Sequence, residues 1–105
     1  MDDKRRHQRL RFGFLIEDPE GERQWMTENI SLGGCFLQTI EKLPVGSKIR
    51  IVFQLPYSTR YIEALGEIKH LQEEGMGLEF IAMEEEGRAE IGRFIKDFLQ
   101  YQDED

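Results

Sequence analysis

The chain has 105 residues, 39% of them hydrophobic and 33% charged, a composition that excludes a disordered or fibrous protein and fits one soluble domain with its own core. The net charge is −7, but residues 1–12 carry five positive side chains against two negative ones, so the rest of the chain sums to −10. An acidic body repels nucleic acid and anionic membranes, because long phosphate polymers favour a broad cationic face.

The sequence also bears on the compartment and on metal binding. Cys35 is the only cysteine, so the chain forms no internal disulfide, and His7 and His70 do not complete a zinc site with it. No apolar run approaches the roughly 20 residues that a membrane-spanning helix needs, and the charged N-terminus is unlike a secretory signal. We therefore expect a cytoplasmic protein with no membrane insertion, no metal and no cofactor.

Most of the chain shows short β-strand patterns separated by turn residues. The apolar side chains of Ile49, Ile51, Phe53 and Leu55 alternate with polar ones, which is the clearest strand pattern in the chain. Gly66 lies inside the next pattern and predicts a β-bulge or a tight bend. The predicted strands are residues 12–17, 22–28, 35–39, 48–55, 61–71 and 76–81, with turns at 19–21, 43–46, 56–59 and 73–75.

Near the C-terminus the hydrophobic period changes from two to about 3.6. Ile91, Phe94, Ile95 and Phe98 fall at i, i+3, i+4 and i+7, so residues 84–101 are predicted to form an amphipathic helix. Six strands followed by one helix indicate a mainly β protein, a small antiparallel β-barrel with the helix packed across an opening or a side. Six aromatic residues are assigned to its core: Phe12, Phe14, Trp25, Phe36, Phe53 and Phe80.

Two segments together describe a candidate anion-binding site. Residues 4–9 bring several positive charges in the form Arg-x-x-x-Arg, with Arg5 and Arg9 as its ends. Residues 29–34 have the form Asn-x-Ser-x-x-Gly and lie at a bend between two predicted strands. Asn and Ser side chains can bond nearby backbone groups, and the two glycines can take the positive φ that other residues resist. A short basic arm on an acidic body suits a small, compact anion.

These two motifs, in this order and at this separation, resemble the PilZ domain family, the bacterial receptors for cyclic di-GMP. The resemblance covers nearly the whole chain and implies a split six-stranded barrel with a C-terminal helix. It implies one domain over residues 1–105, divided into a flexible basic arm (1–11), a barrel (12–81) and a helix (84–101). It also implies a non-catalytic receptor that passes the signal to an unidentified effector protein.

The resemblance assigns ligand contacts residue by residue. Arg5 and Arg9 would bind phosphate oxygens or a guanine edge, or lie flat on a base, because the guanidinium is a planar fork of donors. Asn29 would meet the guanine edge and Ser31 would bond a phosphate or a base. Gly34 would let the backbone approach the ligand closely. Weaker ligand-binding candidates are Lys4, Arg6 and Gly33.

Other interpretations stay open. Taken singly, the arm could be a solubilising tail and the bend an ordinary turn. A PilZ-like interaction module that does not bind the dinucleotide would usually lack both motifs, whereas this chain keeps them. A small barrel that binds single-stranded nucleic acid would need an exposed face of basic and aromatic residues. Ser31 has no His or acid in a recognisable catalytic pattern, so no enzyme is predicted.

Overall fold

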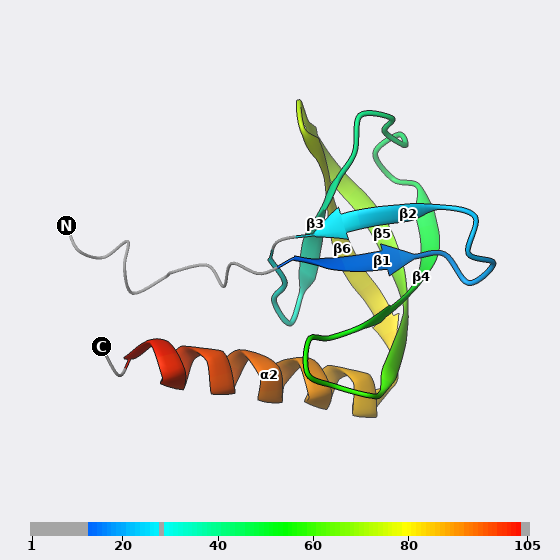
Figure 1. The fold of residues 1–105 in the computed structure, drawn as a ribbon. Coiled ribbons are helices and arrows are strands. Elements are labelled where there is room, and N and C mark those ends of the chain that lie inside the picture. Colours follow the sequence, from blue (N-terminus) through cyan, green and yellow to red (C-terminus); the bar gives the residue numbers. More distant parts are fainter. Residues whose placement is uncertain (1–12, 28, 104–105) are drawn as a thin grey trace.

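The computed structural model describes residues 13–27 and 29–103 of the chain, with side chains as far as residue 98. Strands of the described part are antiparallel to their neighbours and close into a barrel in the order β1-β2-β3-β6-β5-β4 (Figure 1). This confirms the predicted six-stranded antiparallel barrel with a C-terminal helix. The elements are β1 (Phe14–Glu17), β2 (Gln24–Thr27), β3 (Gly34–Gln38), β4 (Lys48–Gln54), β5 (Tyr61–Gln72), β6 (Gly75–Met83) and α2 (Glu85–Asp103).

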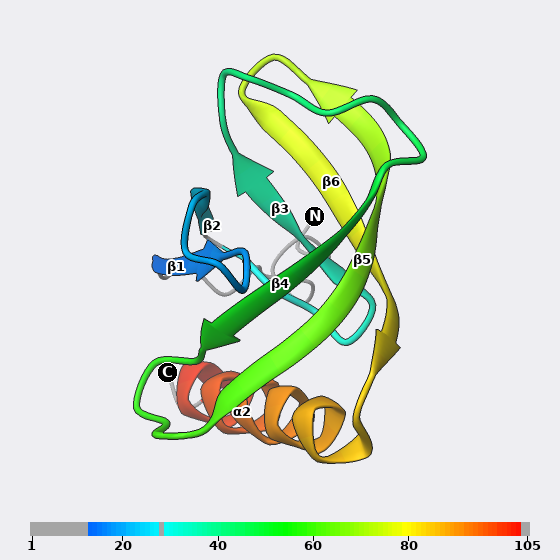
Figure 2. The ribbon, with the colours of Figure 1, turned by 90° about the vertical axis from the view of Figure 1, so that its right-hand side faces the viewer.

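The barrel is uneven around its circumference. The long strands β5 and β6 form a hairpin that runs from the helix to the opposite end of the molecule (Figure 2). β4 is paired with β5 along its whole length, whereas among the described residues β2 and β3 are paired only at Met26 and Gln38. Two register shifts bend the β5–β6 hairpin, one between Leu65 and Gly66 and one between Ile68 and His70. The first confirms the irregularity predicted at Gly66.

Alternation along the strands fills the barrel. Ile51 and Phe53 of β4 are buried together with Ile62 and Ile68 of β5, as their period of two predicts. The ring of Phe53 also stacks on that of Phe80, with 6.1 Å between centroids. The rest of the core consists mainly of apolar side chains from all six strands. Thr27 is the one buried polar residue among those described, and its hydroxyl donates to the Asn29 carbonyl.

The helix α2 covers one end of the barrel (Figures 1 and 2). Ile91 of α2 is fully buried, and Phe94 and Ile95 of the same helix pack against the barrel core. The predicted apolar face of the helix is therefore the face that contacts the barrel. In the described part of the chain, no helix has the length and apolar character needed to cross a membrane. The loop after β3 and the turn between β5 and β6 lie at the opposite end (Figure 1).

One aromatic assignment is wrong and one falls outside the described residues. Phe36 does not belong to the core, because it alternates with buried Cys35 and Leu37 along β3 and therefore faces outward. Phe12 precedes the described part of the chain. Element boundaries also differ slightly from those predicted: β6 runs on to Met83, and the helix covers Glu85–Asp103.

Candidate ligand-binding site

Residues 29–34 form a tight turn between β2 and β3, and Ser31 organises it. The backbone N–H groups of Gly33 and Gly34 donate to Ser31 Oγ at 3.2 and 3.3 Å. The Ser31 hydroxyl donates in turn to the Gly34 carbonyl at 3.3 Å, and the Ser31 N–H reaches the same carbonyl at 2.8 Å. Ile30 is buried and bridges to Cys35, which anchors the turn to the barrel. The motif serine therefore shapes the turn, as serine side chains in such turns do.

The motif glycine, Gly34, is required by strand packing. It starts β3 and pairs with Glu79 of β6. A Cβ at this position would overlap the carbonyl oxygen of Leu78 and lie 3.1 Å from the Glu79 Cα. The absent side chain thus lets two strands approach each other, which is a different reason from the predicted close approach to a ligand.

The second glycine of the turn, Gly33, is under no such restriction. The nearest atom to a Cβ built there is Ser31 Oγ, at 4.0 Å. The expected positive φ is found at neither turn glycine, because the described glycines with positive φ are Gly21 and Gly46. The serine hydrogen bonds close the turn with ordinary backbone angles instead.

Beside the turn, the outer face of β3, β6 and β5 carries an open hollow of about 370 Å³. Asn29 and Ser31 line it from the turn, Phe36 from β3, and Lys69 and His70 from β5. We call it the β3–β6–β5 hollow. Its remaining lining residues are Gly33, Gly34, Cys35, Gly77, Leu78 and Glu79.

Two glycines of β6 let rings lie across this face. A Cβ on Gly77 would overlap the imidazole of His70, and a Cβ on Gly75 would lie 2.7 Å from Cε2 of Phe36. In register, Phe36 and His70 are both partners of Gly77, one from each neighbouring strand. Flat rings on an open surface are what planar bases stack on.

Several polar side chains of the hollow make few or weak contacts within the described part of the chain. Within the described part of the chain, the Asn29 amide and the His70 imidazole have no hydrogen-bond partner. The Lys69 ammonium lies 3.5 Å from a Glu79 carboxylate oxygen and 3.8 Å from one of Glu67; the pair with Glu79 is exposed to solvent, whereas Glu67 is partly buried. Exposed pairs of this kind are weak and exchange readily for a stronger anion.

The one cysteine of the chain, Cys35, lines the hollow with a buried thiol. Burial raises the pKa of the Cys35 thiol to about 12, so this group stays a neutral thiol and a poor nucleophile. Among the described residues, no group of three or more His, Cys, Asp or Glu side chains could hold a metal ion.

The structure brings together part of the predicted site. Asn29, Ser31, Gly33 and Gly34 all line the hollow. The four predicted arm residues, Lys4, Arg5, Arg6 and Arg9, lie outside the described residues. Phe36, Lys69 and His70 were not predicted as site residues. The outward phase of Phe36 could have been read from the alternation after Gly34, whereas the bulge that positions His70 has no clear sequence signal.

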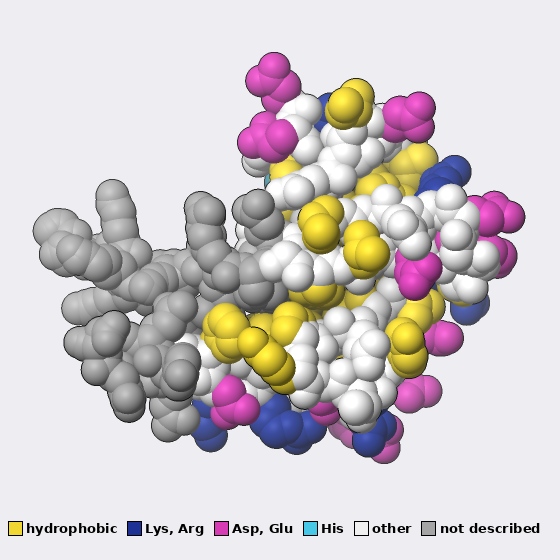
Figure 3. Space-filling model, in the orientation of Figure 1, with side chains coloured by type: hydrophobic (Ala, Val, Ile, Leu, Met, Phe, Trp, Pro, Cys, Tyr) yellow, Lys and Arg dark blue, Asp and Glu magenta, His cyan; other side chains and the backbone are white. Residues whose placement is uncertain are grey.

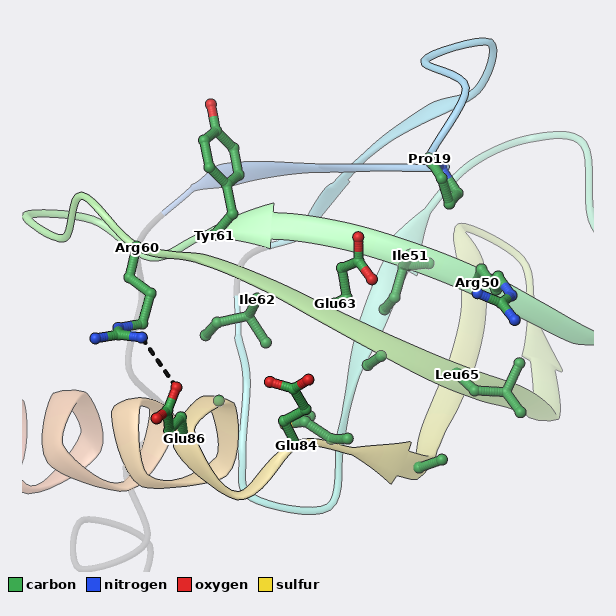
Figure 4. Close-up of a pocket in the computed structure, with 14 residues that line it drawn as sticks. Pro19, Arg50, Ile51, Arg60, Tyr61, Ile62, Glu63, Leu65, Glu84 and Glu86 are labelled. Atoms are coloured by element: carbon green, nitrogen blue, oxygen red, sulfur yellow. Dashed lines mark hydrogen bonds and ion pairs between the residues drawn. The ribbon is translucent and has the colours of Figure 1, made fainter.

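A second, larger hollow lies elsewhere on the described surface. It has a volume of about 580 Å³ and lies between the outer face of β4 and β5 and the start of α2 (Figure 4). Glu63, Glu84 and Glu86 point into this region, and Arg60 donates to Glu86 at 3.2 Å. Its three carboxylates outnumber its two arginines, Arg50 and Arg60, and Arg60 is already paired with Glu86, which disfavours an anionic ligand. It contains neither sequence motif.

The comparison with protein families agrees with the resemblance seen in the two sequence motifs. The PilZ domain model matches residues 3–97, which include both motifs and all six strands. The comparisons with curated proteins and with solved structures give no match. A match over nearly the whole chain, together with a six-stranded barrel and a closing helix, identifies the family: the chain belongs to the PilZ domain family.

Proposed function

We propose that this protein is a non-catalytic receptor for cyclic di-GMP, which binds on the β3–β6–β5 hollow. PilZ domains are a family of receptors for this dinucleotide, which supports the ligand class. The observation that carries the proposal is that the turn of residues 29–34 opens onto the same hollow as Phe36, Lys69 and His70. One surface thus offers an amide, a cation and flat rings to a ligand that has phosphates and purine bases.

Each described group has a definite role in this proposal. The Asn29 side chain has both a donor and an acceptor free for a guanine edge. Lys69 acts as a point charge for a phosphate, since its ammonium is exposed and its pair with Glu79 is a weak, exposed one. Phe36 and His70 offer ring faces to a base.

The motif serine and glycine act by positioning. The hydroxyl of Ser31 already makes three hydrogen bonds within the turn, so we assign it the role of holding Asn29 at the hollow rather than a direct ligand contact. Gly34 keeps β3 against β6 beneath the ligand.

Arg5 and Arg9 supply the remaining contacts in this proposal, from the segment that precedes Gly13. Their guanidinium groups bind phosphate or the guanine edge and close over the ligand. An arm fixed by the ligand, together with the ligand itself, makes a composite surface that an effector protein can distinguish from the free state.

The test is isothermal titration calorimetry of the full chain with cyclic di-GMP. A bidentate arginine contact to guanine contributes about 1 to 3 kcal/mol, so Arg5→Ala and Arg9→Ala should each weaken binding about tenfold to a hundredfold. Asn29→Ala should weaken it about fivefold, because a hydrogen bond to an uncharged group contributes about 1 kcal/mol. The matched control, Arg50→Ala/Arg60→Ala, removes two arginines that line the other hollow and not the proposed site, and it should leave the affinity unchanged.

GTP is the ligand control, because it has the same base and a greater negative charge. Equal affinity for GTP, or an equal loss in the Arg50→Ala/Arg60→Ala variant, would reduce the interaction to nonspecific charge. An absence of both binding heat and thermal shift at high cyclic di-GMP would leave the alternative of a protein-interaction module.

A further inference from the structure

The end of the barrel away from α2 exposes aliphatic side chains. Ile40 is 90% exposed, and Val45 of the same loop is 58% exposed. Figure 3 shows hydrophobic surface between acidic side chains at this end, over the loop after β3 and the turn between β5 and β6. We call residues 39–42 and 73–74 the distal tip.

The backbone of the distal tip is held by hydrogen bonds that link its two segments. The Thr39 N–H donates to the Glu74 carbonyl at 3.0 Å, and the Lys42 ammonium donates to the Glu73 carbonyl at 2.9 Å. The Thr39 hydroxyl also donates to the Glu41 carbonyl at 2.9 Å. Ile40 is therefore presented to solvent by an ordered loop. A partner that covers it has little backbone freedom to remove, which favours binding.

The charges around Ile40 have one dominant sign. Glu41, Glu73 and Glu74 are all exposed. The single cation of the tip is Lys42, and its ammonium is directed to the carbonyls of Ile40 and Glu73. The surface therefore has an apolar centre with an anionic rim, which complements an apolar segment flanked by Lys or Arg. A second copy of the same tip would bring six carboxylates together, which disfavours self-association.

We propose that the distal tip docks a cationic amphipathic segment of a partner protein. Ile40 packs between apolar side chains of that segment, and the carboxylates of Glu41, Glu73 and Glu74 pair with its cations. The docking itself does not rest on the proposed ligand.

The location of the tip gives this interaction a regulatory role, and this role rests on the proposed function. Phe36 of the hollow is four residues before Ile40 on the chain, or about 13 Å at 3.3 Å per residue. Gly75, which lies beneath the Phe36 ring, directly follows Glu74. A partner docked at the tip is thus close to the hollow in which the proposed ligand binds.

The experiment is a two-dimensional NMR titration of the isotope-labelled full chain with a synthetic amphipathic peptide of leucine and lysine. A leucine and glutamate peptide of the same pattern is the charge control. We expect amide shifts at residues 39–42 and 73–77 with the lysine peptide only. Ile40→Ser should raise the dissociation constant at least fivefold, and Glu73→Gln/Glu74→Gln should do the same.

Two matched variants separate docking at the tip from general attraction to an acidic protein. Tyr57→Ser removes a side chain that is even more exposed, and Glu20→Gln/Glu22→Gln removes two exposed carboxylates from the β1–β2 turn. Neither should change the affinity. Shifts centred elsewhere, or equal weakening in these controls, would overturn the proposal.

Sedimentation of the free chain tests the other occupant. A dimer that Ile40→Ser dissociates would assign the tip to a second copy and overturn docking of a partner. Peptide binding that persists in Arg5→Ala/Arg9→Ala would show that the tip acts independently, so the failure of one proposal does not imply the failure of the other.

Discussion

The region around α2 and the β3–β6–β5 hollow use their polar groups in opposite ways. Beside α2, Glu90 accepts hydrogen bonds from Ser58 at 2.9 Å and from Arg93 at 2.7 Å, so charges are paired within the protein. In the hollow, the side-chain amide of Asn29 and the imidazole of His70 have no hydrogen-bond partner in the described part of the chain. Groups already paired contribute to the fold, and unpaired exposed groups are available to a ligand.

Packing follows the same division. Ile91 of α2 is fully buried against the barrel, whereas the rings of the hollow lie on its outer surface. The comparison teaches that this small domain keeps its stabilising contacts and its candidate binding contacts on separate parts of the barrel. Substitutions should therefore affect either the free energy of unfolding or ligand affinity, and rarely both.

The largest expected effect is on the helix side. Ile91→Ala should lower the free energy of unfolding by about 2 to 5 kcal/mol, because it leaves a cavity between α2 and the barrel. Urea denaturation measures this, with Ile81→Ala as the control at an exposed strand position. Titration at low temperature, where the variant stays folded, should give an unchanged affinity for cyclic di-GMP. A large loss of affinity in the folded variant would show that the two regions are coupled.

The two adjacent glycines of the turn give the next largest effect. Gly34→Ala should lower the free energy of unfolding by about 1 to 3 kcal/mol, because its Cβ meets the Leu78 backbone and pushes β3 away from β6. Gly33→Ala has open space and an unexceptional φ, so it should change stability by less than about 0.5 kcal/mol. Parallel urea denaturation of both variants measures the difference. Similar losses in the two variants would contradict the assigned role of Gly34.

These glycines also show how far sequence reasoning reaches. The barrel followed from local signals, since alternation such as that of Ile51 and Phe53 and the helical spacing around Ile91 depend only on nearby residues. The motif predicted that Gly34 matters. The reason, a carbonyl of β6 pressed against it, depends on strand pairing that the motif does not encode.

The composition of the hollow shows the same limit. Asn29 and Ser31 were predicted from their motif, and the structure brings both to one surface. Lys69 and His70 come from a strand 38 or more residues later, and these adjacent residues both line the hollow beside the register shift between Ile68 and His70. A sequence pattern of period two cannot place side chains beyond such a shift. The arm residues stay a prediction, because they lie outside the described residues.

A strained residue on the helix side should give a smaller effect of opposite sign. Tyr57 has a φ of 66° and is 98% exposed, so it adopts a left-handed conformation without a packing contribution from its ring. Tyr57→Gly should raise the free energy of unfolding by about 0.5 to 1 kcal/mol, since glycine adopts this conformation without steric cost. Thermal and urea denaturation measure the gain. Tyr61→Gly, in regular β5, should instead destabilise; a loss in both variants would mean that Tyr57 makes a stabilising contact.

The smallest expected effect depends on pH and probes the paired charges beside α2. The hydrogen bond from Arg93, and then that from Ser58, lower the pKa of Glu90 below its usual value of 4.5. The folded protein therefore favours the ionised carboxylate. This contribution is fully present above pH 4.5 and is lost as the pH falls through the lowered pKa of the folded state. Because the group is near the surface, we expect less than about 1 kcal/mol at pH 7.

The variant Glu90→Gln isolates this contribution. Its deficit in the free energy of unfolding relative to the unmodified protein should be largest at pH 7 and should shrink as the pH falls from 4.5 to 3, measured by urea denaturation at each pH. In an Arg93→Gln background the same substitution should cost less at pH 7, because the strongest hydrogen bond to the carboxylate is already gone. A deficit that is constant with pH would mean that Glu90 stabilises the region beside α2 by packing and not by its charge. The contrast between paired charges at α2 and unpaired polar groups at the hollow would then have no electrostatic basis.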